Sequence, residues 1–161
     1  MSTRKIHATF ECFIEKDGKY LMLHRNRDKR IMPGVWMAPG GKREQGEGLF
    51  EAVHREVMEE TGLTVENLRI RVTGVGWMQD IDTEVFFHMV RADYVLGELI
   101  DCPEGKLEWL TPEEIRDLPD LLSEFTPEVL DHIFGDDQEV HSYIAHYDKG
   151  NHIIKFRIEE S

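Results

Sequence analysis

The sequence is poor in several features that would each point to a particular class of protein. It has two cysteines, Cys12 and Cys102, which lie far apart and form no CxxC pair. We therefore expect reduced thiols rather than a disulfide framework. The first ten residues lack the apolar segment of a secretory signal, and no stretch approaches the roughly 18 apolar residues of a membrane span. These absences predict a cytoplasmic protein.

Positive charge is also scarce. The chain has 32 acidic and 19 basic residues, which gives a formal net charge of −13. A surface this negative repels DNA and RNA, because binding to these polymers depends on neutralising their phosphates. A small anionic substrate is still compatible with this charge if local cations or a bound metal reverse the field in one pocket. We expect a small-molecule partner, no nucleic acid polymer and no membrane.

A length of 161 residues with 40% hydrophobic residues fits one compact domain over residues 1–161. Strands are predicted at residues 7–15, 19–24, 68–77, 84–94, 139–147 and 152–158, and helices at 48–60, from 112 onward and at 127–134. Thr111 and Thr126 are expected to cap the two later helices, and Gly62 to end the first. Hairpin turns are expected at Asp17-Gly18 and at residues 148–151. The mixture predicts an α+β fold in which helices cover a mixed sheet.

The segment with the clearest chemistry is residues 41–63, GKREQGEGLFEAVHREVMEETGL. Glu56, Glu59 and Glu60 fall on one side of the predicted helix, since positions three and four apart share a face. The apolar side chains at positions 50, 53 and 57 are expected to form a separate core face. Crowded carboxylates repel one another, and a hard divalent cation such as Mg²⁺ gives a reason for the crowding. Gly40 and Gly41 would let the backbone approach such a site.

This segment resembles the Nudix box, G-x5-E-x7-R-E-U-x-E-E-x-G-U, where U is a bulky aliphatic residue. The matching positions are Gly41, Glu47, Arg55, Glu56, Val57, Glu59, Glu60, Gly62 and Leu63. A complete chance match has odds on the order of one in a million, given the composition of the chain. The resemblance implies a Nudix fold, with a mixed β-sheet sandwiched between α-helices and the box at 41–63 forming a loop–helix–loop.

The resemblance also implies roles for individual residues. In the family, the glutamates at the positions of Glu56, Glu59 and Glu60 hold Mg²⁺ or Mn²⁺, often with the backbone carbonyl at the position of Gly40. The arginine matching Arg55 pairs with the glutamate matching Glu47 and orients the metal-binding helix. The carboxylate matching Glu56 commonly acts on the attacking water as well.

Features outside the box favour one subgroup. Residues 34–36 leading into 39–42 look like the corresponding loop of MutT-like hydrolases, which cleave oxidised purine nucleoside triphosphates. Glu104, five residues before Trp109, matches a further acidic residue that this subgroup often has near the metal, although an exposed loop glutamate is an equally good interpretation. The candidate substrate-binding residues are Arg25 and Arg27 in a cationic loop, together with Met37, Gly41 and Lys42.

The sequence therefore predicts an enzyme that hydrolyses (deoxy)nucleoside triphosphates such as 8-oxo-dGTP to the monophosphate and pyrophosphate. Met37 departs from this pattern, because some oxidised-purine hydrolases have a polar base-reading residue there and methionine cannot hydrogen-bond a base specifically. Base readout would then come from elsewhere, for example residues 119–125, or selectivity would be broad. Two alternatives stay open: a sugar-nucleotide or dinucleotide pyrophosphatase, and a non-catalytic nucleotide-sensing module. The histidines look too scattered for a zinc site, and either a monomer or a homodimer is compatible with the sequence.

Overall fold

The computed structural model describes residues 3–150 and 152–161, so Asn151 of the predicted turn at 148–151 lies outside the described residues. The elements follow the chain in the order β1 (Lys5–Lys16), β2 (Lys19–Arg25), β3 (Trp36–Met37), β4 (Gly40–Lys42), α1 (Leu49–Thr61), β5 (Thr64–Met78), β6 (Thr83–Leu96), β7 (Gly105–Leu110), α2 (Pro112–Arg116), α3 (Pro127–Phe134), β8 (His141–Tyr147) and β9 (Ile153–Ile158). Each predicted strand and helix is present, with boundaries that differ by a few residues. No helix among the described residues is long and apolar enough to cross a membrane.

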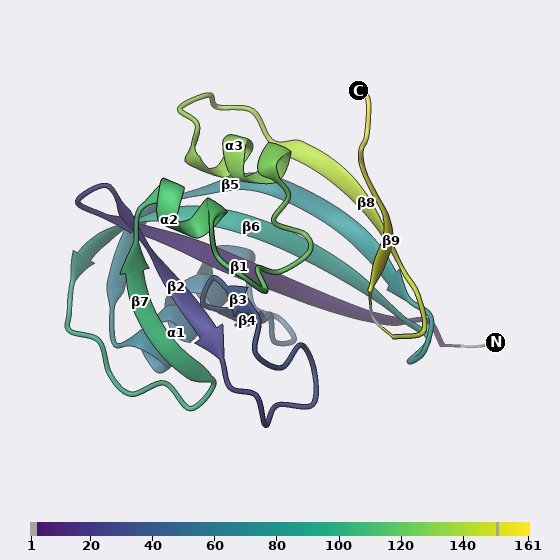
Figure 1. Cartoon of the computed structure of the whole chain (residues 1–161), viewed down its shortest axis with the longest axis horizontal. Helices are drawn as coiled ribbons and strands as arrows, with labels where there is room; N and C mark the ends of the chain where they lie inside the picture. The colour runs from purple at the N-terminus through teal and green to yellow at the C-terminus, as the bar shows by residue number, and fades with distance from the viewer. Residues whose placement is uncertain (1–2, 151) are drawn as a thin grey trace.

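All the strands belong to one mixed sheet, as the sequence predicts. Its order is β3-β2-β1-β6-β5-β8-β9, while β4 also pairs with β1 and β7 with β2. The pairs β1–β6 and β5–β8 are parallel, and the other pairs are antiparallel. The long strands in the middle curl across the molecule, and β8 and β9 lie at the right of Figure 1.

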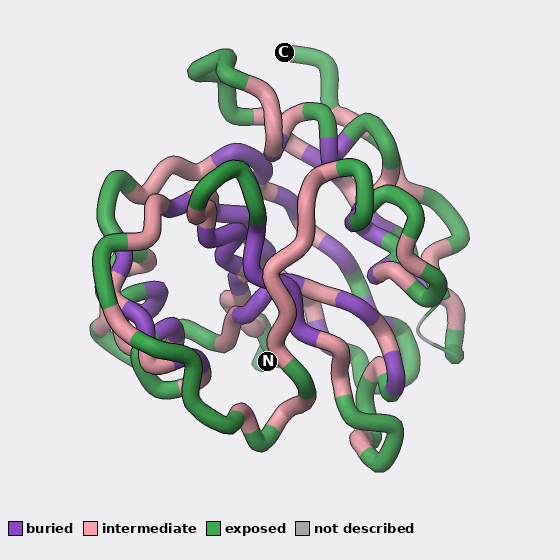
Figure 2. Tube along the Cα trace, turned by 60° about the vertical axis from the view of Figure 1, so that its left-hand side comes forward, coloured by how far each residue is buried: buried purple, intermediate pink, exposed green. Residues whose placement is uncertain are grey.

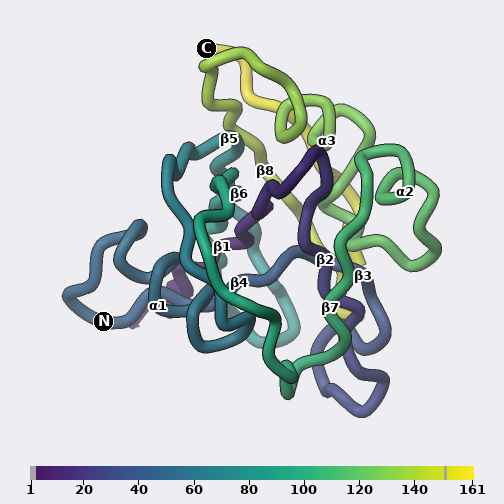
Figure 3. The backbone as a smooth tube through the Cα atoms, turned by 90° about the vertical axis from the view of Figure 1, so that its left-hand side faces the viewer, coloured from purple at the N-terminus to yellow at the C-terminus, as the bar shows by residue number. Residues whose placement is uncertain are grey.

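Helices lie on both faces of this sheet, which confirms the predicted sandwich. Figure 3 shows α1 on one side of the strands, and α2 and α3 on the other. The two layers enclose separate hydrophobic clusters, one with α1 residues such as Val53 and Val57 and one with α2 and α3 residues such as Ile115 and Ile133. In Figure 2 buried positions are concentrated along the inner strands, whereas connecting loops are exposed.

Local signals set the ends of the helices. The side chain of Thr111 accepts from the backbone N–H of Glu114, and that of Thr126 accepts from the backbone N–H of Val129. Each threonine thereby satisfies one free donor of the first helical turn. Gly62 ends α1 with φ +76°, a left-handed conformation that glycine adopts without strain. These caps were predicted from the sequence and are confirmed.

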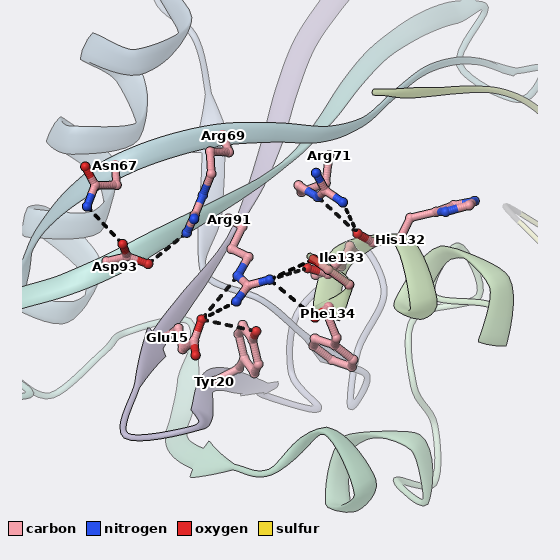
Figure 4. Close-up of polar contacts among 11 residues, drawn as sticks. Glu15, Tyr20, Asn67, Arg69, Arg71, Arg91, Asp93, His132, Ile133 and Phe134 are labelled. Atoms are coloured by element: carbon pink, nitrogen blue, oxygen red, sulfur yellow. Dashed lines mark hydrogen bonds and ion pairs between the residues drawn. The ribbon is translucent and has the colours of Figure 1, made fainter. Parts of the chain in front are cut away.

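The carbonyl end of α3 is held by arginines from the sheet (Figure 4). Arg91 on β6 donates to the carbonyl oxygens of residues 133, 134 and 135 and also to the carboxylate of Glu15. Arg71 on β5 donates through Nε and Nη2 to the carbonyl of His132, at 3.0 and 2.8 Å. Positive charge at this end of a helix complements both the unpaired carbonyls and the helix dipole. The arginines therefore fix α3 against the sheet.

β1 and β2 pair with each other only near their turn, and the glycine- and proline-rich segment that follows β2 separates them further along. β3 pairs with β2 and β4 pairs with β1, so residues 36–42 lie between the two strands. At Gly40 a Cβ atom would lie 2.0 Å from the carbonyl oxygen of Phe10, so only glycine fits there. This insertion brings the start of the box to the middle of the sheet and next to α1.

The predicted core face of α1 needs one correction. Phe50 is 43% exposed, whereas Ala52, Val53, Val57 and Thr61 are buried. The buried arc of the helix is therefore rotated away from Phe50 and toward the carboxylates. The reason is that β4 packs against this side of α1, a contact that helical periodicity alone cannot reveal.

Candidate active site

Two carboxylates of α1 lie directly against the backbone of β4. The N–H of Gly40 donates to Oε2 of Glu60 at 3.2 Å. A Cβ atom on Gly41 would lie 2.5 Å from Cδ of Glu56, so this carboxylate packs against the glycine backbone. The close approach that the sequence predicted for the two glycines is present.

Arg55 links three of the glutamates in the box. Its Nε and Nη2 donate to the two carboxylate oxygens of Glu47 at 2.7 and 2.9 Å, as expected from the resemblance. Its Nη1 donates to Glu56 at 2.7 Å and more weakly to Glu59 at 3.4 Å. The hydrogen bonds from Arg55, together with the backbone N–H of Glu44, lower the pKa of Glu47 to about 2. Glu47 is therefore an anion at any pH near neutrality and anchors the arginine.

The surroundings of Glu60 disfavour its negatively charged form. Burial raises its pKa to about 7, and the charges of Glu56 and Glu104 push it in the same direction. The N–H of Gly40 and the charge of Arg25 act against this increase but do not cancel it. A group of oxygen donors with excess negative charge is what a hard divalent cation requires.

Glu104, immediately before β7, is tied to the cationic loop. Arg25 Nη1 donates to it at 2.7 Å and Lys29 Nζ at 3.3 Å. The cross-strand pair Arg25–Gly105 sets this contact, because it places residue 104 beside the end of β2. Glu104 is therefore a half-buried, paired carboxylate whose charge is felt at Glu60, not an isolated loop residue.

The donor set fits a magnesium or manganese ion. Glu56, Glu60 and Glu104 are half-buried, and Glu59 lies at the exposed rim with a side chain 59% exposed. All of these donors are oxygens, as is the carbonyl of Gly40. No three of these carboxylates have oxygens within 4.8 Å of one another. Arg55 and Arg25 hold the oxygens of Glu56 and Glu104, so a cation must displace part of these hydrogen bonds.

The other predicted substrate residues are more dispersed. Arg27 is exposed, and its Cγ lies 3.4 Å from where a Cβ would stand on Gly34. Met37 pairs with Leu23 across β3 and β2 and is partly buried against the core cluster of α2 and α3. Lys42 is exposed, and its carbonyl oxygen accepts from Arg55 Nη2 at 3.1 Å. Residues 120–122 run beside β3, with hydrogen bonds to the backbone of Trp36 on both sides.

Sequence reasoning missed one pair of acidic residues near these elements. Glu11 pairs with Gly40 across β1 and β4, and its pKa is raised well above the usual range by burial and by the charge of Glu124. Glu124 is 6% exposed and accepts from the hydroxyl of Tyr147 at 2.6 Å. The one available signal was a glutamate inside the apolar run FECFI, which marks an unusual charge in a buried strand.

Comparisons with known proteins agree with this geometry. A family model described as a NUDIX domain matches residues 5–133. The uncharacterized Nudix hydrolase YvcI of Bacillus subtilis is 34% identical over 67% of this chain and 68% of its own length. The nucleoside triphosphatase NudI of Escherichia coli is 31% identical over 65% of this chain and 73% of its own.

Solved structures give the same result. The crystal structure of a MutT protein from Bacillus halodurans superimposes with a TM-score of 0.82 at 28% identity, covering 95% of this chain and 97% of that one. The family model spans well over half of the chain and includes the whole box and Glu104, while β8 and β9 lie outside the matched residues. The chain belongs to the Nudix family of hydrolases.

Proposed function

We propose that this chain hydrolyses (deoxy)nucleoside triphosphates to the nucleoside monophosphate and pyrophosphate, with 8-oxo-dGTP as the favoured substrate. The observation that carries the proposal is the contact between β4 and α1, where Glu56 and Glu60 face the backbone of Gly41 and Gly40. Arg55, anchored on Glu47, fixes Glu56 in this position. The result is a rigid set of oxygen donors at the edge of a helix.

Glu56, Glu59, Glu60 and Glu104, with the carbonyl of Gly40, would hold Mg²⁺, and Mn²⁺ would substitute for it. When bound, the cation supplies a Lewis acid that polarises phosphoryl oxygens and makes water a better nucleophile. Glu56 would accept the proton of the attacking water, because it is the metal-binding carboxylate that Arg55 fixes directly. Arg55 and Glu47 would position Glu56 rather than bind the metal ion, since their charges are already paired with each other.

Positive charge for the substrate phosphates comes from the loop that follows β2. Arg25 and Lys29 contact Glu104, beside the carboxylates of α1, so they are placed to offset the charge that builds on the leaving oxygen of the nucleoside monophosphate. Arg27, Met37, Gly41 and Lys42 would contribute further contacts along β3 and β4. Residues 120–122 run beside β3, and the segment 119–125 would form the second wall around the base.

Support for the substrate class comes from the relatives. NudI is named a nucleoside triphosphatase, and the Bacillus halodurans structure is named a MutT protein. The resemblance noted in residues 34–42 and at Glu104 favours the same subgroup. A sugar-nucleotide or dinucleotide pyrophosphatase is the alternative enzyme, and a non-catalytic sensing module is the alternative outside catalysis. The complete set of box glutamates argues against the sensing module.

The test is a comparison of kcat/KM for 8-oxo-dGTP, dGTP, dATP, ADP-ribose and a diadenosine polyphosphate, each with Mg²⁺ and with excess EDTA. We expect the highest value for 8-oxo-dGTP and no turnover in EDTA. A preference for ADP-ribose or the dinucleotide would change the substrate assignment but not the proposed catalytic site. Nucleotide binding without turnover of any substrate would support the sensing module instead.

A further inference from the structure

The stretch from the end of α3 to the first residue of β8 carries three side chains of metal-ligating types, far along the chain from the Nudix box. Asp137, Glu139 and His141 occupy alternate positions. One carboxylate oxygen from each acid and one imidazole nitrogen all lie within 4.8 Å of one another. Three donors this close are compatible with the first coordination shell of a single cation, where metal–ligand distances are about 2 Å.

A separate observation at His141 also points to a ligand. Its Nε2 is shielded from solvent and has no hydrogen-bond partner among the described residues, although it lies 3.8 Å from Oδ1 of Asp137. That separation is too long for a hydrogen bond, and a buried polar atom without a partner costs free energy. An ion between the imidazole and the carboxylate would give Nε2 of His141 the partner that it lacks.

The imidazole of His141 is held in place by a second histidine. The ring of His132, in the last turn of α3, stacks on it with centroids 3.4 Å apart and planes 13° apart. The sequence predicts that the histidines are too scattered for a zinc site, and among His132, His141, His146 and His152 the fold stacks the rings of His132 and His141. The contact arises because α3 packs across β5 and β8 pairs with β5, which brings the two histidines together.

We propose that Asp137, Glu139 and His141 bind a divalent transition metal ion, with Zn²⁺ as the representative. The mixture of two carboxylate oxygens and one imidazole nitrogen suits Zn²⁺ and its neighbours in the first transition row, which accept both donor types. Mg²⁺ prefers oxygen ligands and water, so it would be bound much more weakly here than at the glutamates of α1.

The surroundings orient the carboxylate of Asp137. Its Oδ1 accepts from the backbone N–H of Glu139 at 3.0 Å and lies 3.1 Å from Nη2 of Arg71. Arg71 is 3% exposed and also holds the carbonyl oxygens of His132 and Asp137, so it fixes both sides of the site (Figure 4 shows its contact with His132). Such outer contacts commonly orient metal ligands. The charge of Arg71 opposes a cation, but Asp136, Asp137 and Glu139 leave the stretch negative overall.

This site is distinct from the proposed catalytic one. It lies next to α3, because His132 stacks on His141, and Figure 3 shows α3 on the side of the strands opposite α1. Binding there neither requires nor excludes nucleotide hydrolysis. The ion would join the carbonyl end of α3 to the start of β8 and stiffen the connection between them.

The test is calorimetric titration of the full chain with Zn²⁺ in saturating Mg²⁺, which occupies the glutamates of α1. We expect one Zn²⁺ per chain and at least a tenfold weaker affinity in His141→Gln and in Glu139→Gln. The matched control is His146→Gln, which changes an exposed histidine on the same strand and should bind Zn²⁺ as the wild type does. Co²⁺ should give a visible absorption spectrum that His141→Gln alters.

Thermal unfolding without metal checks that the variants fold, and Zn²⁺ should raise the unfolding temperature of the wild type but not of His141→Gln. Equal Zn²⁺ affinity in the wild type, His141→Gln and Glu139→Gln would overturn the proposal. So would loss of the Zn²⁺ site in Glu60→Gln with retention in His141→Gln, because the ion would then sit at α1.

Discussion

The guanidinium of Arg55 donates to both carboxylate oxygens of Glu47, from Nε at 2.7 Å and from Nη2 at 2.9 Å. This two-point contact leaves Nη1 directed at Glu56, which it meets at 2.7 Å. A fork of this kind fixes direction as well as distance. The position of Glu56 therefore depends on a residue that itself holds no metal.

Replacing Arg55 with lysine tests this dependence. Arg55→Lys keeps the charge but loses the planar fork, so Glu47 and Glu56 can no longer be held together. We expect kcat/KM to fall roughly 10- to 100-fold, with a higher Mg²⁺ concentration needed for half-maximal rate. Arg43→Lys is the matched control, because the Arg43 side chain donates to the backbone carbonyl of Glu47 rather than to its carboxylate. Equal kinetics for the two variants would contradict the positioning role.

The contact of Gly41 with Glu56 predicts a severe effect from one added methyl group. In Gly41→Ala the new Cβ would lie 2.5 Å from Cδ of Glu56, so the carboxylate must move. We expect loss of most of kcat while the chain stays folded, as measured by steady-state kinetics and circular dichroism. In Gly48→Ala the new Cβ would meet only the end of the Glu51 side chain, at 3.2 Å, and activity should be largely kept. Full activity in Gly41→Ala would place the reacting atoms elsewhere.

Glu56→Gln tests the chemistry of the carboxylate with little change of shape. The amide oxygen of glutamine can still accept from Arg55, but the side chain has no charge and cannot take a proton. We expect most of kcat to be lost, with a nearly unchanged unfolding temperature in the absence of metal. A kcat within about threefold of the wild type would refute the role of Glu56.

His88 predicts how stability changes with pH. Burial lowers its pKa below the ordinary value of about 6.5, so the folded chain prefers the neutral imidazole. As the pH falls below about 6.5, the unfolded chain binds a proton that the folded chain resists, and the free energy of unfolding decreases. Above this pH the contribution of His88 to the free energy of unfolding is fully present. His88→Gln should therefore flatten the pH dependence between about pH 6.5 and 5, measured by urea unfolding.

The exposed His146 provides the comparison for that experiment, since His146→Gln should keep the pH dependence of the wild type. If His88→Gln and His146→Gln give the same curves, burial of His88 is not the cause.

The position of attack distinguishes the MutT-like reaction from its relatives. We expect water to add at the β-phosphorus, so that a reaction in ¹⁸O-water places the label in pyrophosphate. Label in the monophosphate would show attack at the α-phosphorus, and label in orthophosphate would show attack at the γ-phosphorus. Mass spectrometry of the products distinguishes these cases. Attack at the α- or the γ-phosphorus would contradict the MutT-like mechanism, but the chain would still belong to the Nudix family.

Local sequence signals predicted much of this molecule. Helix caps at Thr111, Thr126 and Gly62 act within four residues of themselves, so their effect can be read from neighbouring letters. The position of Glu56, Glu59 and Glu60 on one side of α1 follows in the same way from their spacing and from helical geometry. Glu47 lies in the loop before α1 and Arg55 lies within α1. Their pairing was predicted from the family resemblance.

The contacts decided by tertiary structure all join distant segments. Glu104 meets Arg25 because β7 pairs with β2, and the two stacked histidines meet because β8 pairs with β5. The charge of Glu124 acts on Glu11 although the two residues lie far apart along the chain. A strand pattern predicts that a strand exists, but it does not specify its neighbour or register. The sequence by itself therefore determined the catalytic helix and its carboxylates. Only the folded sheet decided which distant charges surround them, because burial and pairing depend on register across the sheet.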